Sequence, residues 1–202
     1  MPTLQSVRYS LRGALAKWFE QPAATFLARI GFTPNRATLA GLALAFGATY
    51  LAAEGLFWQA GLVNAAGALF DMLDGAIARQ KNVVSKRGAL LDSSADRVAE
   101  GALLVGLAWH YSDVFTYDRT AVLLAFMAFG GSMMVSYVRA RAEGLGFKGT
   151  SGFLTRPERV VIITAGLIIG QPKIALWILA IGTPISALHR FWAEWRTAGK
   201  SA

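Results

Sequence analysis

The chain has 202 residues, of which 54% are hydrophobic and 16% charged, whereas an ordinary soluble domain has roughly 25% charged residues. The absence of cysteine excludes disulfides and thiolate metal sites, and the presence of only two histidines argues against a histidine-rich zinc site. The net charge of +8 leaves two interpretations open, a nucleic-acid-binding protein or a membrane protein with basic cytoplasmic loops.

The first 32 residues are predicted to form an amphipathic helix that lies in the membrane interface. Val7, Leu11 and Trp18 fall at helical spacing on one face of this segment, and Arg8 and Arg12 lie on its flanks. No continuous apolar stretch precedes residue 37, so we expect no cleavable signal peptide.

Residues 33–195 are predicted to form a bundle of six transmembrane helices, so the whole chain is expected to be a single all-α polytopic membrane domain. Thr33 and Pro34 are typical of a helix N-cap followed by proline in the first turn, and they would open the first span. Frequent glycines within the spans suit close helix packing in lipid. The predicted spans lie near residues 37–56, 58–78, 89–111, 119–141, 157–171 and 173–192.

The distribution of basic residues predicts the orientation of these spans. All of the 20 lysines and arginines except Arg119 and Lys173 fall on one side of the predicted bundle. By the positive-inside rule that side is cytoplasmic, so both termini and the active site are expected to face the cytoplasm from the cell membrane. The positive charge is therefore mostly topological, and we expect no nucleic-acid partner.

Four aspartates are concentrated at the cytoplasmic ends of the second and third spans. Asp71 and Asp74 are three residues apart, and Asp92 and Asp96 are four apart, so each pair lies on one helical face. The short connection makes the two helices antiparallel neighbours. Converging carboxylates repel unless cations neutralise them, and four can hold two hard divalent ions, Mg²⁺ or Mn²⁺. Ion pairing with nearby arginines and lysines, or a cation-coupled transport pathway, are the alternatives.

These residues form the pattern D-x-x-D-G-x-x-A-R-x(8)-G-x(3)-D-x(3)-D, which resembles the signature of the CDP-alcohol phosphatidyltransferase family. The resemblance implies that an acceptor hydroxyl attacks the lipid-bearing phosphate of CDP-diacylglycerol and that CMP leaves. It also implies a homodimer. It argues against the transporter, which has no need of the glycines, alanine and arginine at these spacings.

The resemblance further implies a role for each matched residue. Asp71, Asp74 and Asp92 would be metal ligands, and Asp96 would be both a ligand of the second metal and the general base. Four residues would line the CDP moiety: Gly75, Ala78, Arg79 and Gly88. The segment that contains Thr33, Pro34, Asn35 and Thr38 resembles the family segment near the cytidine, although helix initiation explains part of this segment equally well.

Arginines near the ends of the last three spans bear on the identity of the acceptor. If Arg139, Arg156 and Arg190 converge, with Arg159 nearby, they form a site for a phosphate, which an already phosphorylated acceptor needs. The positive-inside rule alone would explain each of them singly, and Thr155 with Glu158 fits a capping box.

The segments 136–143 and 156–159 resemble those of phosphatidylinositol-phosphate synthases of actinobacteria, which use inositol 1-phosphate. Arg139 stands where lysine is frequent in that group, and the two side chains are not equivalent donors. Phosphatidylglycerophosphate synthase, with glycerol 3-phosphate as acceptor, is the alternative within the family.

Overall fold

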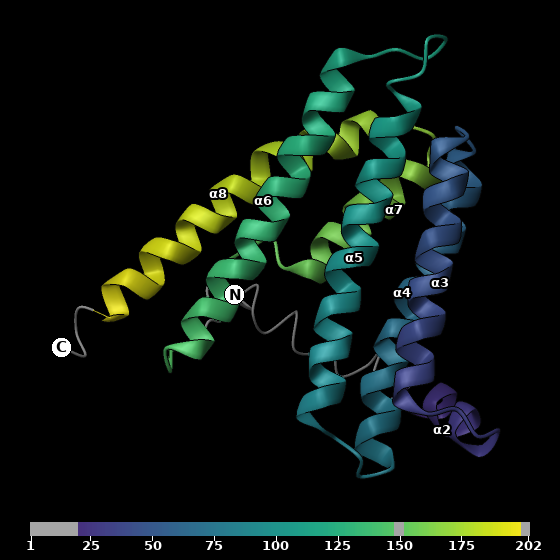
Figure 1. Ribbon diagram of the computed structural model, residues 1–202, viewed down its shortest axis with the longest axis vertical. Helices are drawn as coiled ribbons and strands as arrows, with labels where there is room; N and C mark the ends of the chain where they lie inside the picture. The colour runs from purple at the N-terminus through teal and green to yellow at the C-terminus, as the bar shows by residue number, and fades with distance from the viewer. Residues whose placement is uncertain (1–19, 148–151, 199–202) are drawn as a thin grey trace, which may run out of the picture. The chain divides into compact units, whose positions relative to one another are not determined.

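The computed structural model describes residues 20–147 and 152–198, and this part of the chain is all-helical, as predicted (Figure 1). Each predicted span corresponds to one helix. The predicted and observed ends differ most at the last helix, which was predicted to end near residue 192 and continues to Ala198. The amphipathic face that includes Val7, Leu11 and Trp18 lies outside the described residues. The helices are α2 (Gln21–Arg29), α3 (Pro34–Ala53), α4 (Phe57–Gln80), α5 (Lys86–His110), α6 (Arg119–Gly144), α7 (Arg156–Ile168) and α8 (Pro172–Ala198).

Four of the described helices are long and apolar enough to cross a membrane, namely α3, α4, α6 and α8. The other two predicted spans differ from these four for two separate reasons. Helix α5 has 25 residues, but aspartates, arginines and Glu100 interrupt its apolar sequence. Helix α7 has only 13 residues, fewer than the roughly 20 that a bilayer requires.

Short polar side chains stand at the beginnings of α3, α5 and α7. The Thr33 hydroxyl accepts the backbone N–H of Arg36 at 3.3 Å, which confirms the predicted cap of α3. The Ser85 hydroxyl accepts the N–H of Gly88 at 3.0 Å at the start of α5. Thr155 is the N-cap of α7, but its hydroxyl donates to the Glu158 carboxylate and caps no backbone N–H, so the predicted capping box is only partly formed.

The chain divides into two compact units, which are described separately. Unit 1 contains Met1–Leu44 and Ala66–Asp96, and unit 2 contains Ala45–Ala65 and Arg97–Ala202. Helices α3, α4 and α5 contribute residues to both units.

Unit 1 is held together by small side chains between α2, α3 and α4. Its buried cluster consists of Ala24, Ala37, Leu73, Ala76 and Ile77. Helix α3 approaches α4 so closely that a Cβ on Gly41 would lie 3.1 Å from the Gly67 carbonyl oxygen and 3.5 Å from the Asp71 nitrogen. This close approach sets α3 directly beside the first signature aspartate.

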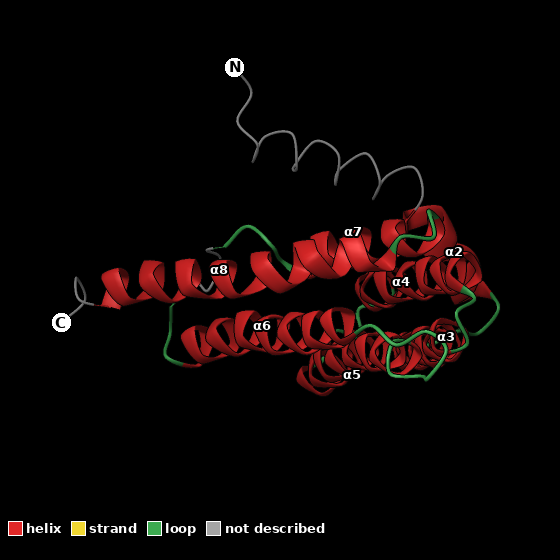
Figure 2. Ribbon diagram, turned by 90° about the horizontal axis from the view of Figure 1, so that it is seen from above, coloured by secondary structure: helices red, strands yellow, loops and turns green. Residues whose placement is uncertain are grey.

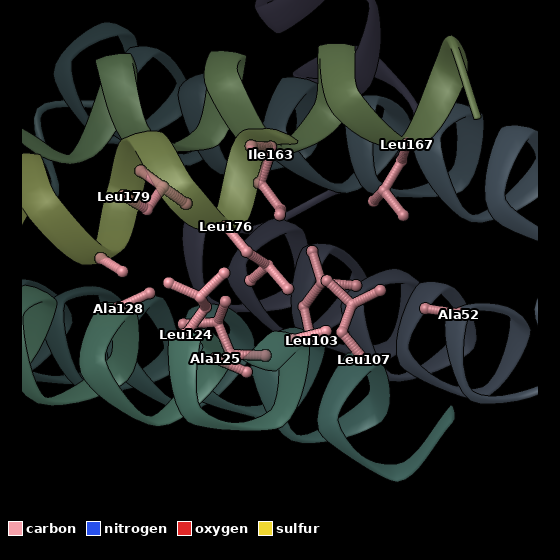
Figure 3. Packing of buried hydrophobic residues seen from close by; sticks show 14 of the residues in the cluster. Ala52, Leu103, Leu107, Leu124, Ala125, Ala128, Ile163, Leu167, Leu176 and Leu179 are labelled. Atoms are coloured by element: carbon pink, nitrogen blue, oxygen red, sulfur yellow. The ribbon is translucent and has the colours of Figure 1, made fainter. Parts of the chain in front are cut away.

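Unit 2 has the larger apolar core, in which α6 and α8 pack against each other (Figure 2). Leu103 and Leu107 of α5, Leu124 of α6 and Leu176 of α8 turn toward one another, and Ile163 and Leu167 of α7 join the cluster (Figure 3). In lipid, helices associate through close packing, because the surrounding chains are as apolar as the side chains.

One glycine illustrates how tight this packing is. A Cβ on Gly131 of α6 would lie 2.1 Å from Thr183 Oγ1 and 2.8 Å from Pro184 Cδ of α8, so no other residue fits without movement. The adjacent Gly130 is also one of the glycines within the predicted spans, but a Cβ placed on it would have no neighbour within 4 Å.

Candidate active site

Three of the four signature aspartates converge within unit 1. Asp71 and Asp74 project from α4 and Asp92 from α5, and one oxygen of each carboxylate lies within 4.8 Å of the others. Asp74 is buried, whereas Asp71 and Asp92 are half-buried. Asp96, one turn further along α5, is half-buried but does not belong to this three-carboxylate group.

A residue of α3 fixes the orientation of the buried aspartate. The Thr38 hydroxyl donates to Asp74 Oδ2 at 2.6 Å, and Thr38 itself is only 4% exposed. Hydrogen bonds to ionised acceptors are among the shorter and stronger ones in proteins. Thr38, which family resemblance associates with the cytidine end, therefore supports the carboxylate group directly.

The chemistry of this group suits a hard divalent cation. All three side chains offer carboxylate oxygens, the ligands that Mg²⁺ and Mn²⁺ prefer. Three negative charges within 4.8 Å of one another in a partly buried site repel, and a cation removes this repulsion. The residues present therefore fit the metal that the signature implies.

The other signature residues, three of them small and one an arginine, lie on the same two helices as the aspartates. A Cβ on Gly75 would lie 3.3 Å from Arg79 Nη1, so the arginine extends back over the glycine that follows Asp74. A Cβ on Gly88 would lie 3.9 Å from Asn35 Oδ1, which brings the predicted cytidine segment to the start of α5. Ala78, which lies between Gly75 and Arg79 in the sequence of α4, is half-buried.

Helix α2 lies near the C-terminal end of α4 (Figure 1), and polar contacts join the two. Glu20, just before α2, accepts from Arg79 Nη2 at 2.5 Å, and Thr25 accepts from Gln80 Nε2 at 2.7 Å. Lys81 donates to the Phe32 carbonyl at 2.8 Å. Nothing in the sequence pattern points to Glu20 as a partner of Arg79, because 59 positions separate them.

The predicted acceptor arginines lie in unit 2 and differ sharply in their surroundings. Arg139 is exposed and donates to Glu143 at 2.8 Å, one turn further along α6. Arg156 is half-buried at the start of α7. Arg159 and Arg190 are both 2% exposed, and Arg190 lies within electrostatic range of Arg139 and Arg159.

Glu100 of α5 is the main partner of Arg159 and was not anticipated from the sequence. Its two oxygens accept from Arg159 Nε at 2.6 Å and Nη2 at 2.8 Å, while Arg159 Nη1 donates to the Leu154 carbonyl at 3.2 Å. Glu100 also lies within electrostatic range of Arg156. In the sequence, only the position of Glu100 one turn after Asp96 indicates that its carboxylate lies on the same face of α5.

Comparison with known proteins gives the same assignment as the signature. The model of the CDP-alcohol phosphatidyltransferase family matches residues 32–195. The phosphatidylinositol phosphate synthase of Mycobacterium tuberculosis is 33% identical over 198 residues, which cover 93% of this chain and 90% of the relative. The Mycobacteroides abscessus enzyme of the same name is 37% identical over 182 residues, or 85% of this chain and 81% of the relative.

Solved structures of the M. tuberculosis synthase, PgsA1, resemble the chain in fold as well. The structure with CDP-DAG bound has a TM-score of 0.80 at 32% identity and covers 88% of this chain and 94% of PgsA1. The structure in complex with manganese and citrate has a TM-score of 0.81, also at 32% identity, and covers 88% and 89%. The chain therefore belongs to the CDP-alcohol phosphatidyltransferase family of membrane enzymes.

Proposed function

We propose that this enzyme transfers the phosphatidyl group of CDP-diacylglycerol to a hydroxyl of inositol 1-phosphate. The acceptor oxygen forms a bond to the lipid-bearing phosphorus, the bond from that phosphorus to the CMP oxygen breaks, and the hydroxyl proton passes to a base on the enzyme. The group formed by Asp71, Asp74 and Asp92 within the complete family signature carries this proposal.

Two divalent cations, Mg²⁺ or Mn²⁺, would be held by the four signature aspartates. When bound, they would neutralise the donor diphosphate and stabilise the charge of departing CMP. Thr38 keeps Asp74 in one orientation for this task, and Asp96 accepts the proton of the attacking hydroxyl. A manganese complex of the related PgsA1 supports the choice of metal.

The donor is bound by the residues that follow and face the carboxylate group. Gly75, Ala78 and Gly88 leave room for the CDP moiety, because each has little or no side chain. Arg79 offers its planar guanidinium to the diphosphate. Thr33, Pro34 and Asn35 approach the cytidine end. The PgsA1 structure with CDP-DAG bound supports this donor.

The acceptor phosphate is bound by Arg139, Arg156 and Arg190. Burial of a guanidinium is costly unless anions compensate it, and Arg190 is 2% exposed. Arg139 and Arg159 act on it more strongly than Glu194 and Glu143 do. A phosphate monoester adds negative charge to this site, whereas neither free inositol nor serine adds net negative charge. The names of the relatives agree with inositol phosphate as the acceptor.

We also propose that α5 and α7 cross the membrane with the other four spans, that both termini are cytoplasmic and that the enzyme is a homodimer. The absence of native cysteine permits a clean test of topology. Val84→Cys should react with an impermeant maleimide from the cytoplasmic side and Phe115→Cys from the opposite side. The reverse pattern would refute the orientation, and crosslinking between single cysteines of two copies would report the dimer.

The acceptor is identified by offering alternatives to the purified enzyme. CDP-diacylglycerol and Mn²⁺ or Mg²⁺ would be supplied with inositol 1-phosphate, glycerol 3-phosphate, free inositol or serine, and CMP release would be followed. We expect CMP and phosphatidylinositol phosphate with inositol 1-phosphate. Release with glycerol 3-phosphate alone would refute the acceptor, and no release with any of the four compounds would refute the proposed transfer.

A further inference from the structure

The four residues before and at the start of α7 are held in place from two sides. The Leu154 N–H donates to Ser186 Oγ of α8 at 3.2 Å, and the Leu154 carbonyl accepts from Arg159 Nη1 of α7 at 3.2 Å. Leu154 is 8% exposed, and a Cβ on Gly182 would lie 2.4 Å from its Cδ1, so its side chain is also wedged against α8. We refer to residues 152–155 as the strap.

Arg159 joins the strap to Glu100. Its Nε and Nη2 donate to the two oxygens of Glu100, and its Nη1 donates to Leu154, so each of its three nitrogens already has an acceptor. A bidentate pair of this kind fixes the guanidinium plane as well as its position. Arg159 is therefore poorly suited to binding a substrate phosphate directly, unlike Arg139, Arg156 and Arg190.

The other end of the strap lies against Arg190. Gly152 has a φ of +113°, a conformation that other residues adopt only with strain, and a Cβ there would lie 3.0 Å from Nε and Nη2 of Arg190. The Nε atom of this buried guanidinium has no hydrogen-bond acceptor among the described residues. The position of the strap thus determines which face of Arg190 an anion reaches.

We propose that Glu100 is a positioning residue of the acceptor-phosphate site, acting through Arg159 and the strap to set Arg190. This inference rests on the proposed function, because it presumes that Arg190 binds the acceptor phosphate. Glu100 holds the charge of Arg159 away from the phosphate and keeps that arginine bonded to the strap. Without the Glu100 charge, Arg159 would be an uncompensated buried cation in electrostatic range of Arg190, free to rotate toward an incoming anion.

Glu100→Gln tests this role with little change in shape. We expect the KM for inositol 1-phosphate to rise at least about tenfold, while the KM for CDP-diacylglycerol stays within about twofold of the wild-type value. Glu54→Gln is the matched control, because Glu54 is an exposed carboxylate at the end of α3, and it should leave both KM values unchanged. A proportional change in both KM values, or a fall in kcat alone, would overturn the positioning role.

A double-mutant cycle establishes the route through Arg159. Arg159→Lys keeps the charge but loses the bidentate pair, so its acceptor KM should resemble that of Glu100→Gln. The double variant should be no worse than either single variant if the two residues act as one unit. Effects that multiply would show that Glu100 acts by another route and would refute the proposal.

A milder variant covers the case in which loss of Glu100 prevents folding. Ser186→Ala removes only the acceptor of the Leu154 N–H, and we expect a rise of about threefold in the acceptor KM with no change in the donor KM. An unchanged acceptor KM in Ser186→Ala would contradict the proposal that the strap positions Arg190. If the wild-type enzyme released CMP with glycerol 3-phosphate but not with inositol 1-phosphate, the proposed function itself would fail, whatever the acceptor KM values of the variants.

Discussion

Replacing Thr38 with valine tests whether the α3 hydroxyl acts on the metal ligands or on the donor nucleotide. The substitution keeps the shape of the side chain and removes the 2.6 Å hydrogen bond from a buried hydroxyl to the Asp74 carboxylate, together with the longer one, 3.2 Å, to the Pro34 carbonyl of the same helix. A hydrogen bond to a charged group contributes about 1.5–3 kcal/mol, which corresponds to roughly a 10- to 150-fold change in an equilibrium constant. Loss of such a support for a metal ligand typically weakens metal affinity by about 10- to 100-fold.

We therefore expect Thr38→Val to raise the Mn²⁺ concentration needed for half-maximal CMP release by one to two orders of magnitude, about 10- to 100-fold. Thr38→Ser retains the hydroxyl and should stay close to the wild-type enzyme. At saturating Mn²⁺ the KM for CDP-diacylglycerol should be nearly unchanged in both variants. An unchanged Mn²⁺ requirement together with a raised donor KM would refute the role at Asp74 and assign Thr38 to the cytidine instead.

Three further predictions concern the proton, the packing and the loop between α5 and α6. Asp96→Asn should abolish turnover while CDP-diacylglycerol binding largely persists, and measurable turnover would remove Asp96 as the base. Gly131→Ala should destabilise the fold by about 1–3 kcal/mol because its methyl group meets Thr183, and thermal unfolding in detergent measures this. The hydrogen bond from Lys173 holds the pKa of Asp118 below its usual value, so the stabilisation is complete above the ordinary aspartate pKa and is lost as the pH falls through the lowered one. Asp118→Asn should therefore lower the unfolding temperature at neutral pH, and a difference that persisted unchanged in strong acid would contradict this cause.

The helices and the pairing of the aspartates on single helix faces could be predicted from the sequence, because both depend on local spacing. An interval of three residues brings Asp71 and Asp74 to one face of α4 whatever surrounds that helix. The cap at Thr33 is equally local, since its acceptor and donor are three residues apart. The family signature, which is likewise a pattern of residue types at fixed spacing, identifies these aspartates without any knowledge of distant contacts.

Roles that depend on distant partners could not be predicted in the same way. Arg159 and Arg156 are close together in the sequence, and the contact with Glu100, 59 positions from Arg159, identifies Arg159 as a buried arginine with a structural partner. We propose a different role, anion binding, for Arg156. The hydrogen bond from Thr38 to Asp74 could not be predicted either, because 36 positions separate the two residues. Gly130 and Gly131 are adjacent and chemically identical, yet only one faces α8.

The Glu100–Arg159 pair also constrains how this protein can evolve. Replacing either residue alone leaves the other as an isolated buried charge, a loss that typically costs about 3–5 kcal/mol and that few membrane proteins tolerate. A lineage that abandons the pair must therefore change both positions almost together, for example to two apolar residues of similar volume. Positions 100 and 159 are therefore expected to vary as a unit among related sequences.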